Sequence, residues 1–164
     1  MRYSGKAIGE RDSVQSANHT SSPNLYWDVK GYSIGFGCFI GNDPDTLAHY
    51  KQLQPLSKQQ AEDLLRSRLQ PVEEAIYKYI TIPLNQNQFD ALADWGYNEG
   101  SGVLAPFNPI TGHGSHLVTL LNTGDYENAS KEFVKWDKSA GQVLPGLLAR
   151  RQEETVLFNT PTTY

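Results

Sequence analysis

The arrangement of apolar and polar positions predicts a β-region near the N-terminus. Residues 26–41 read YWDVKGYSIGFGCFIG, in which aromatic and β-branched residues interleave with glycines. This pattern is typical of short strands joined by tight turns. The polar run at 13–24 has the Ser, Asn and Pro density of a loop, and GNDPDT at 41–46 that of a turn. We therefore expect a small β-hairpin preceded by a loop and followed by a turn.

From Leu56 onward, apolar positions recur every three or four residues, which is the period of an α-helix. Ser57 and Gln60 have the spacing of a capping box. Pro71 is expected to kink or restart the helix that follows, because proline lacks an amide donor. Further helices are predicted to begin at Asn85, to span 116–121, to follow the apolar stripe 126–136, and to run from Pro145 to about 158.

These elements predict an α+β fold that is mainly helical. A length of 164 residues suits one domain. We expect this domain, 1–164, to hold a lobe at 1–56 with the hairpin, a linker helix at about 57–80 and a helical lobe at 81–158. A cleft between two such lobes is a common place for a ligand.

The net charge and the distribution of apolar residues limit the kinds of partner that this protein is expected to bind. The formal net charge of −4 argues against nucleic acid, since phosphate binding favours a basic surface. The basic pairs Arg66 with Arg68 and Arg150 with Arg151 are interpreted as solvated helix faces. No run is long and apolar enough to span a bilayer, and no apolar segment follows the first basic residues, so neither stable membrane insertion nor a secretory signal is predicted.

Cofactor chemistry finds little support in the sequence. The single Cys38 excludes an internal disulfide and a pair of thiol ligands. His113 and His116 form an H-x-x-H, but no third ligand stands at metal spacing, so no metal site is predicted. The glycines of 31–41 do not lead into a helix as a nucleotide loop would. The three tryptophans are expected to pack in the core rather than on sugars.

Five segments, in order, resemble the phage lysozymes of glycoside hydrolase family 24. The family pattern is a Glu, then Tyr-x-Asp-x-x-Gly, then Thr-Ile-Gly-x-Gly, and later a Gln-x-Phe-Asp-Ala-Leu segment. The similar segments are YWDVKGYSIGFG at 26–37, LSKQQAEDLL at 56–65, LNQNQFDALADWGYNEGSG at 84–102, LLNTGDYENASKEFVKW at 120–136 and GQVLPGLLARRQEETVLF at 141–158. The resemblance implies a lysozyme-like fold over most of residues 26–158.

The resemblance also implies a catalytic set. Asp28 falls on the family's catalytic aspartate, Ser33 near its catalytic threonine, and Glu10 is the candidate acid. Glu10 stands farther from Tyr26 than the family spacing, which implies an insertion, and Cys38 stands where a histidine is common. Glycoside cleavage requires a proton for the leaving oxygen and a carboxylate beside the sugar. Three residues of segments near the family's cleft are candidate substrate-binding groups: Asn98, Arg150 and Arg151.

The activity that this resemblance implies is hydrolysis of bacterial peptidoglycan between N-acetylmuramic acid and N-acetylglucosamine, without a cofactor or metal. We expect a monomer that stays in the host bacterial cytoplasm until it reaches the wall, or that forms part of a virion. Two other hypotheses stay open. One is a lytic transglycosylase, and the other is a non-catalytic glycan-binding virion module.

Overall fold

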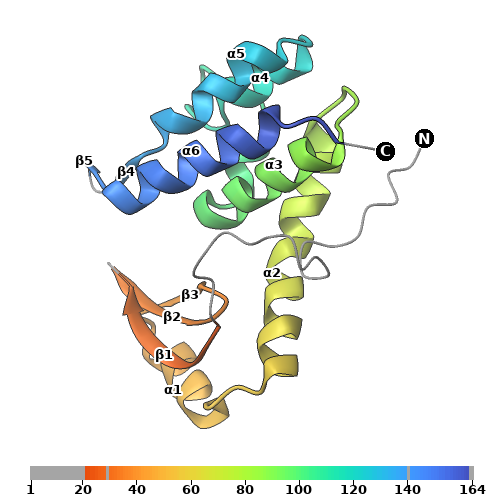
Figure 1. Cartoon of the computed structure of the whole chain (residues 1–164). Coiled ribbons are helices and arrows are strands. Elements are labelled where there is room, and N and C mark those ends of the chain that lie inside the picture. Colours follow the sequence, from red (N-terminus) through yellow and green to blue (C-terminus); the bar gives the residue numbers. More distant parts are fainter. Residues whose placement is uncertain (1–20, 29, 140, 163–164) are drawn as a thin grey trace. The chain divides into compact units, whose positions relative to one another are not determined.

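The computed structural model describes residues 21–28, 30–139 and 141–162. The chain divides into two compact units, unit 1 ending at Arg68 and unit 2 beginning at Leu69. Unit 1 holds a sheet and a short helix, unit 2 holds most of the helices, and α2 continues from one into the other (Figure 1). The elements are β1 (Ser22–Asp28), β2 (Gly31–Gly35), β3 (Cys38–Gly41), α1 (Pro44–Leu53), α2 (Lys58–Tyr79), α3 (Gln86–Glu99), η2 (Ser101–Leu104), α4 (His116–Asn122), α5 (Tyr126–Glu132), η3 (Phe133–Lys135), β4 (Lys138–Ser139), β5 (Gln142–Val143) and α6 (Pro145–Asn159).

The sheet of unit 1 confirms the predicted hairpin and extends it to three antiparallel strands in the order β1, β2, β3. Tyr26 pairs with Ser33 and Asp28 with Gly31, while Ser33 pairs with Phe39 on the other side. The loop predicted for 13–24 is wrong at its end, because 22–24 belong to β1. Residues 13–20 of that run lie outside the described residues. Ser22 pairs with Gly35 of β2, and the Pro23 carbonyl accepts a hydrogen bond from the Leu56 amide at 2.8 Å. These contacts with distant residues override the low strand propensity of the polar segment.

Helix α1 was not predicted, since its first residues were interpreted as a turn. The Asp43 side chain accepts a hydrogen bond from the Thr46 amide at 2.9 Å, and Pro44 occupies the first helical turn. An acidic N-cap followed by proline is a helix-start signal as well as a turn signal. No residue of α1 is fully buried. Its apolar stripe is therefore too weak to reveal the helix from periodicity.

The core of unit 1 lies between one face of the sheet and the helices. Its buried members are Ile34, Cys38, Ile40, Leu56 and Ala61, and partly buried side chains of β1, α1 and α2 pack around them. Burial of this apolar set holds the sheet against α1 and the first turns of α2.

Helix α2 begins as predicted. The Ser57 hydroxyl accepts from the Gln60 amide at 3.1 Å, and the Gln60 side chain accepts from the Ser57 amide at 2.8 Å. Of the two expected effects of Pro71, a kink or a restart, the restart is wrong, because the helix runs unbroken to Tyr79. Proline removes one backbone hydrogen bond, and burial of the flanking Leu69 and Val72 offsets that loss.

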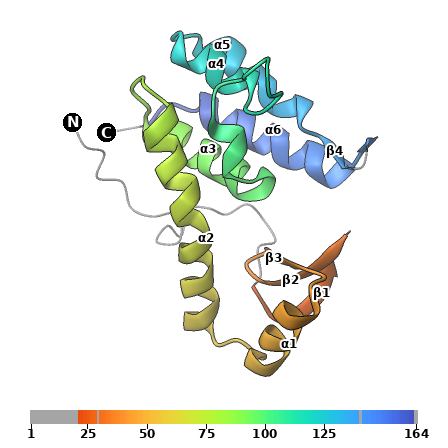
Figure 2. The same ribbon diagram turned by 180° about the vertical axis from the view of Figure 1, so that it is seen from behind.

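Unit 2 is built around α3. Its predicted capping box between Asn85 and Gln88 is present, and α3 packs mainly against α6. Trp95 is fully buried and meets Phe133 edge to face, with ring centroids 5.5 Å apart. The core prediction is confirmed for Trp95 but wrong for Trp27, which is 59% exposed. Figures 1 and 2 show α4 and α5 beside these helices, with the β4–β5 hairpin before α6.

The remaining helix predictions hold with small corrections. Helices α4 and α6 match the predicted spans, whereas the stripe 126–136 forms α5 followed by the short 3-10 helix η3. Among the helices that the structure describes, none is both long enough and apolar enough to cross a membrane. The α+β, mainly helical class is confirmed.

Candidate functional site

Asp28 and Ser33 meet at the end of the β1–β2 hairpin. The Ser33 hydroxyl donates a hydrogen bond to Asp28 Oδ2 at 3.1 Å. Ser33 is fully buried, whereas Asp28 is partly exposed. Strand pairing produces this contact, because Asp28 lies opposite Gly31 and Ser33 is two residues further along the same face. The structure thus brings two of the three predicted catalytic residues together.

Side chains along a strand point alternately to the two faces of the sheet, and this alternation shows which residues share the face of Asp28 and Ser33. Tyr26 and Phe39 are both register partners of Ser33, so their side chains lie on the same side as Asp28. Trp27, by contrast, pairs with Tyr32 and points to the opposite face, where the two rings meet edge to face at 5.4 Å. The polar site therefore has aromatic neighbours from two strands.

Electrostatics couple Tyr26 to the pair. Burial raises the pKa of the Tyr26 hydroxyl, the nearby Asp28 carboxylate raises it further, and a hydrogen bond with Ser33 partly offsets both. Tyr26 is therefore a neutral hydrogen-bonding group beside the carboxylate. Sequence reasoning did not assign it to the site, although the β-strand period places residues 26 and 28 on one face.

Glu10, the predicted acid, lies outside the described residues. Cys38, which stands at the position where the family pattern often has histidine, is buried in the core of unit 1. Burial raises the pKa of its thiol, and the Arg68 guanidinium acts in the opposite direction. Cys38 is therefore a packing residue, with its charge suppressed.

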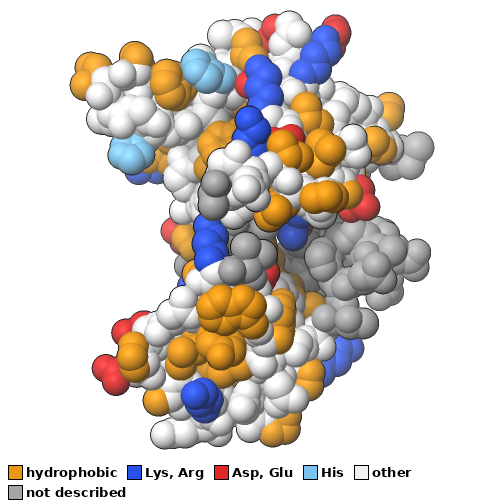
Figure 3. All heavy atoms as spheres, turned by 90° about the vertical axis from the view of Figure 1, so that its left-hand side faces the viewer, with side chains coloured by type: hydrophobic (Ala, Val, Ile, Leu, Met, Phe, Trp, Pro, Cys, Tyr) orange, Lys and Arg blue, Asp and Glu red, His pale blue; other side chains and the backbone are white. Residues whose placement is uncertain are grey.

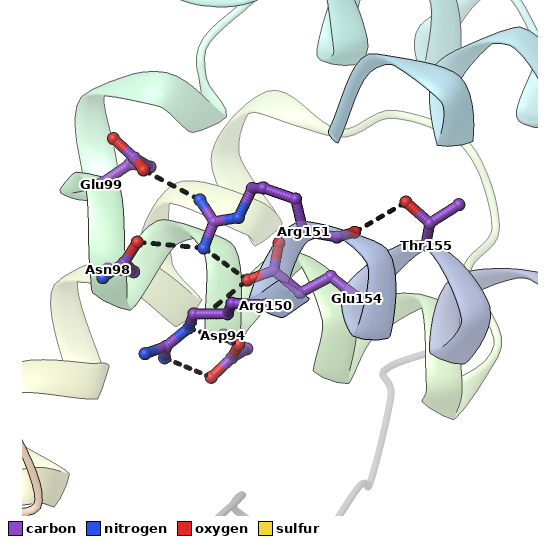
Figure 4. A network of polar contacts seen from close by, with 7 residues as sticks. All are labelled: Asp94, Asn98, Glu99, Arg150, Arg151, Glu154 and Thr155. Atoms are coloured by element: carbon purple, nitrogen blue, oxygen red, sulfur yellow. Dashed lines mark hydrogen bonds and ion pairs between the residues drawn. The ribbon is translucent and has the colours of Figure 1, made fainter. Parts of the chain in front are cut away.

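A second polar cluster lies within unit 2, between α3 and α6 (Figure 4). Arg150 binds Asp94 through two hydrogen bonds of 2.7 and 3.1 Å. Arg151 donates to Glu99 at 2.9 Å, to Asn98 at 3.0 Å and to Glu154 at 2.7 Å. The two arginines thus tie the C-terminal part of α3 to α6.

Glu154 has a special place in this cluster. Burial raises its pKa to about 9; the Arg151 guanidinium opposes this, while a hydrogen bond with Asp94 adds to it. The balance of charges supports the raised pKa of Glu154, since the carboxylates of Asp94 and Glu99 already neutralise the guanidinium groups of Arg150 and Arg151. Burial also acts to raise the pKa of Asp94, but the charge and hydrogen bonds of Arg150, together with Glu154 and Arg151, lower that pKa overall. Asp94 is accordingly charged and Glu154 neutral near pH 7.

The positions of Arg150 and Arg151 in this cluster bear on two predictions from the sequence: the solvated helix face and the substrate-binding group. Arg150 and Arg151 do not form a solvated face, because Arg151 is fully buried and Arg150 mostly so. Asn98, Arg150 and Arg151 lie together in this cluster, and their role in substrate binding stays a prediction. The sequence did not single out Asp94 and Glu99, and only the four-residue spacing from Arg150 to Glu154 indicated a pair. Contact between α3 and α6 could not be read from spacing.

Comparison with solved structures identifies the fold. The muramidase domain of SpmX from Asticaccaulis excentricus matches with a TM-score of 0.66 and 27% identity, over 87% of this chain and 90% of that one. A P22 lysozyme matches with a TM-score of 0.63 and 29% identity, over the same shares. The fold is lysozyme-like, as the sequence resemblance implied.

The family follows from the sequence itself. The family model described as phage lysozyme matches residues 18–154, and the chain belongs to this family. It is 37% identical to an endolysin of Bacillus phage B103 over 131 residues, which is 80% of this chain and 44% of that protein. It is also 37% identical to the endolysin of Salmonella phage P22, over 63% of this chain and 64% of that protein. The chain thus spans less than half the length of the endolysins of Bacillus phages B103 and PZA.

Proposed function

We propose that this protein is a peptidoglycan hydrolase that cleaves the β-1,4 bond between N-acetylmuramic acid and N-acetylglucosamine. The observation that carries the proposal is the hydrogen bond from Ser33 to the partly exposed Asp28 carboxylate at the end of the β1–β2 hairpin, in a chain of the phage lysozyme family. The names of its relatives, endolysin and muramidase, agree with this activity.

The chemistry assigns a role to each group. The Ser33 hydrogen bond holds Asp28 Oδ2, and a water bound to the other carboxylate oxygen is activated for attack on the anomeric carbon. Glu10 is the proposed acid that protonates the leaving oxygen. If the water attacks directly, the two carboxyl groups stand roughly 6.5–9.5 Å apart and the configuration inverts. No cofactor or metal is needed for these steps.

The cluster of unit 2 has a supporting role in this proposal. Asn98 is exposed, and the side chains of Asp94, Arg150 and Glu99 are 33%, 24% and 22% exposed. A sugar can therefore reach this part of the cluster. Arg151 is fully buried and engaged by three partners, which favours a positioning role for it. Asn98 remains a candidate for substrate contact.

The test is wall clearing by the full chain and two isosteric variants. The parent is expected to clear purified bacterial walls, and Asp28→Asn and Glu10→Gln are each expected to lower the rate by about 10²- to 10⁴-fold. Thermal unfolding of each variant checks that the fold is kept. A Glu10→Gln variant that clears walls at the parental rate removes Glu10 from the mechanism. A folded parent that binds walls without clearing them supports a non-catalytic glycan-binding module instead.

The products separate hydrolysis from its closest chemical alternative. Hydrolysis leaves a reducing N-acetylmuramic acid end, whereas a lytic transglycosylase leaves an anhydro sugar one water lighter. Mass spectrometry of the released fragments distinguishes the two. The hydroxyl and carboxylate of Ser33 and Asp28, which can hold a water, favour the hydrolytic product.

We also propose that the protein acts as a monomer on the wall, without nucleic acid as a partner. The acidic net charge of −4 supports the second point. Sedimentation of the protein at its working concentration tests whether it is a monomer. The proposed route is from the host cytoplasm to the wall, with assembly into a virion as the alternative, and fractionation of a producing culture distinguishes them.

A further inference from the structure

A loop of unit 2 that the proposed mechanism does not use stands out between η2 and α4. We call residues 105–115 the finger. Ile110 lies in the middle of the finger and is 92% exposed, the largest value among the large hydrophobic side chains in the described part of the chain. Pro109 beside it is exposed as well. In Figure 3, hydrophobic and histidine side chains lie together on a projecting edge of unit 2. Ile110 therefore contributes almost nothing to the core of this chain.

The tip of the finger is held by its own hydrogen bonds. Asn108 Oδ1 accepts from the Ile110 amide at 2.9 Å and from the Thr111 amide at 3.3 Å. The Gly112 amide donates to the Asn108 carbonyl, and the Asn108 amide donates to the His113 carbonyl, both at 2.8 Å. The His113 amide donates to Thr111 Oγ1 at 3.4 Å. The conformation that presents Ile110 to solvent is thus built into the finger itself.

Hydrogen bonds also close the base of the finger. The Phe107 amide donates to the Ser115 carbonyl at 3.1 Å, and the Ser115 amide donates to the Ala105 carbonyl at 2.9 Å. Proline has no amide hydrogen, so Pro109 leaves no donor free. Every backbone N–H of 107–113 therefore has an acceptor within the chain, and none of them depends on water.

The sequence around the finger has no permanently charged side chain. Residues 100–124 contain no Asp, Glu, Lys or Arg, although the whole chain has 18 acidic and 14 basic residues. The titratable side chains of this stretch are His113 and His116. Transfer of a charged side chain, or of a backbone amide without an acceptor, into an apolar medium is unfavourable. Neither penalty applies to the tip of the finger.

We propose that the finger is a lipid-binding element whose tip inserts Ile110 into the surface of a bilayer. An apolar partner accounts for both the exposed side chain and the satisfied amides. A charged wall polymer would instead be recognised by charged side chains, which the finger does not have. The contact is shallow and reversible, and it needs no spanning helix. It is independent of the proposed hydrolase activity and holds the chain at the membrane over which a bacterial wall lies.

The test measures partition of the full chain onto phosphatidylcholine vesicles by co-sedimentation. We expect the parent to bind, and Ile110→Ser to lower the partition coefficient by about tenfold, because transfer of one large apolar side chain accounts for a factor of this size. Val156→Ser is the matched control. It removes another β-branched side chain, 68% exposed on α6 of the same unit, and should leave partition unchanged. Thermal unfolding checks that both variants keep the fold.

Three further measurements separate insertion from other kinds of adsorption. Ile110→Leu keeps the apolar volume and should bind like the parent. Asn108→Ala should weaken binding, because the amides of Ile110 and Thr111 then enter the bilayer without their acceptor. Raising the salt concentration from about 0.1 to about 0.5 M should not release the parent, since salt screens charges but does not weaken apolar transfer.

The outcomes are separate from those of the proposed function. Parental partition of Ile110→Ser, or an equal loss in Val156→Ser, overturns the inference. So does release of the parent by salt, or a dimer in solution that Ile110→Ser dissociates, which makes the tip an interface between copies. A chain that clears walls but does not bind vesicles overturns this inference alone. A chain that binds vesicles through Ile110 but never clears walls overturns the proposed function alone.

Discussion

The Ser33 hydroxyl, fully buried in β2, points at the Asp28 carboxylate across the hairpin and donates to it at 3.1 Å. The donor is fixed by the sheet, while the acceptor reaches solvent. Such an arrangement orients a carboxylate without removing it from water. It also links the conformation of the hairpin to the chemistry proposed for its end.

Removal of the Ser33 hydroxyl should lower activity without unfolding the chain. A hydrogen bond to a charged group contributes about 1.5–3 kcal/mol, and partial solvation of Asp28 reduces this, so we expect Ser33→Ala to lower kcat by about tenfold. Wall-clearing kinetics and thermal unfolding measure the two effects. Ser67→Ala, which loses only a hydroxyl bond to the Leu64 carbonyl on α2, is the control. Parental activity of Ser33→Ala would argue against the proposed role.

Loss of Arg151 should destabilise unit 2 strongly. Its guanidinium is fully buried and bonds Glu99, Asn98 and Glu154. Removing one partner leaves buried acceptors unpaired, so Arg151→Met should lower the free energy of unfolding by about 3–5 kcal/mol. Urea denaturation gives this value.

The control for that change is an exposed ion pair. Lys131 contacts Glu127 at 2.7 Å, but both side chains are mostly in solvent. Lys131→Met should change the free energy of unfolding by less than about 1 kcal/mol. Equal effects of the two substitutions would show that burial does not set the strength of the Arg151 contacts.

The neutral state of Glu154 predicts a decrease in stability with rising pH. Its pKa rises from 4.5 to about 9 on folding, so the folded chain keeps a proton that the unfolded chain releases in this range. The contribution is complete below pH 4.5 and is lost as the pH approaches 9. The lowered pKa of Asp94 acts only at more acidic pH.

Glu154→Gln should flatten this dependence, because the amide stays neutral throughout. Urea denaturation of parent and variant at several pH values between about 5 and 9 gives the two slopes. Arg150, Arg151, Asp94 and Glu99 are unchanged in the variant, so the difference in slope reports Glu154. Parallel curves would mean that Glu154 is charged in the folded chain.

Two glycines of the loop before α4 form a matched pair. Gly112 and Gly114 both have positive φ, of 69° and 85°, but only a Cβ at Gly114 would meet a backbone atom, the Pro106 oxygen, at 2.2 Å. Gly112→Ala should cost about 1–2 kcal/mol through backbone strain, and Gly114→Ala about 1–3 kcal/mol more. Thermal unfolding of both variants gives the comparison, and equal losses would exclude the steric contribution.

Local sequence determined much of this protein. Capping residues fixed the starts of α2 and α3, because a side chain that satisfies free amides acts within one turn. Glycine spacing and strand period indicated the hairpin and placed Tyr26 and Asp28 on one face. The family resemblance points to Asp28 and Ser33, and the structure joins these two residues by a hydrogen bond.

Tertiary structure decided what depends on contacts between distant segments. Residues 22–24 became a strand because distant segments supply their partners: Ser22 pairs with Gly35, and the Pro23 carbonyl accepts from the Leu56 amide. Trp27 stayed exposed because it continues a core-facing row beyond the end of the core. Arg151 became buried because α6 packs on α3, which brings Asn98 and Glu99 to a residue more than 50 positions away. Spacing along a chain reports local periodicity, whereas burial and pairing depend on which surfaces meet.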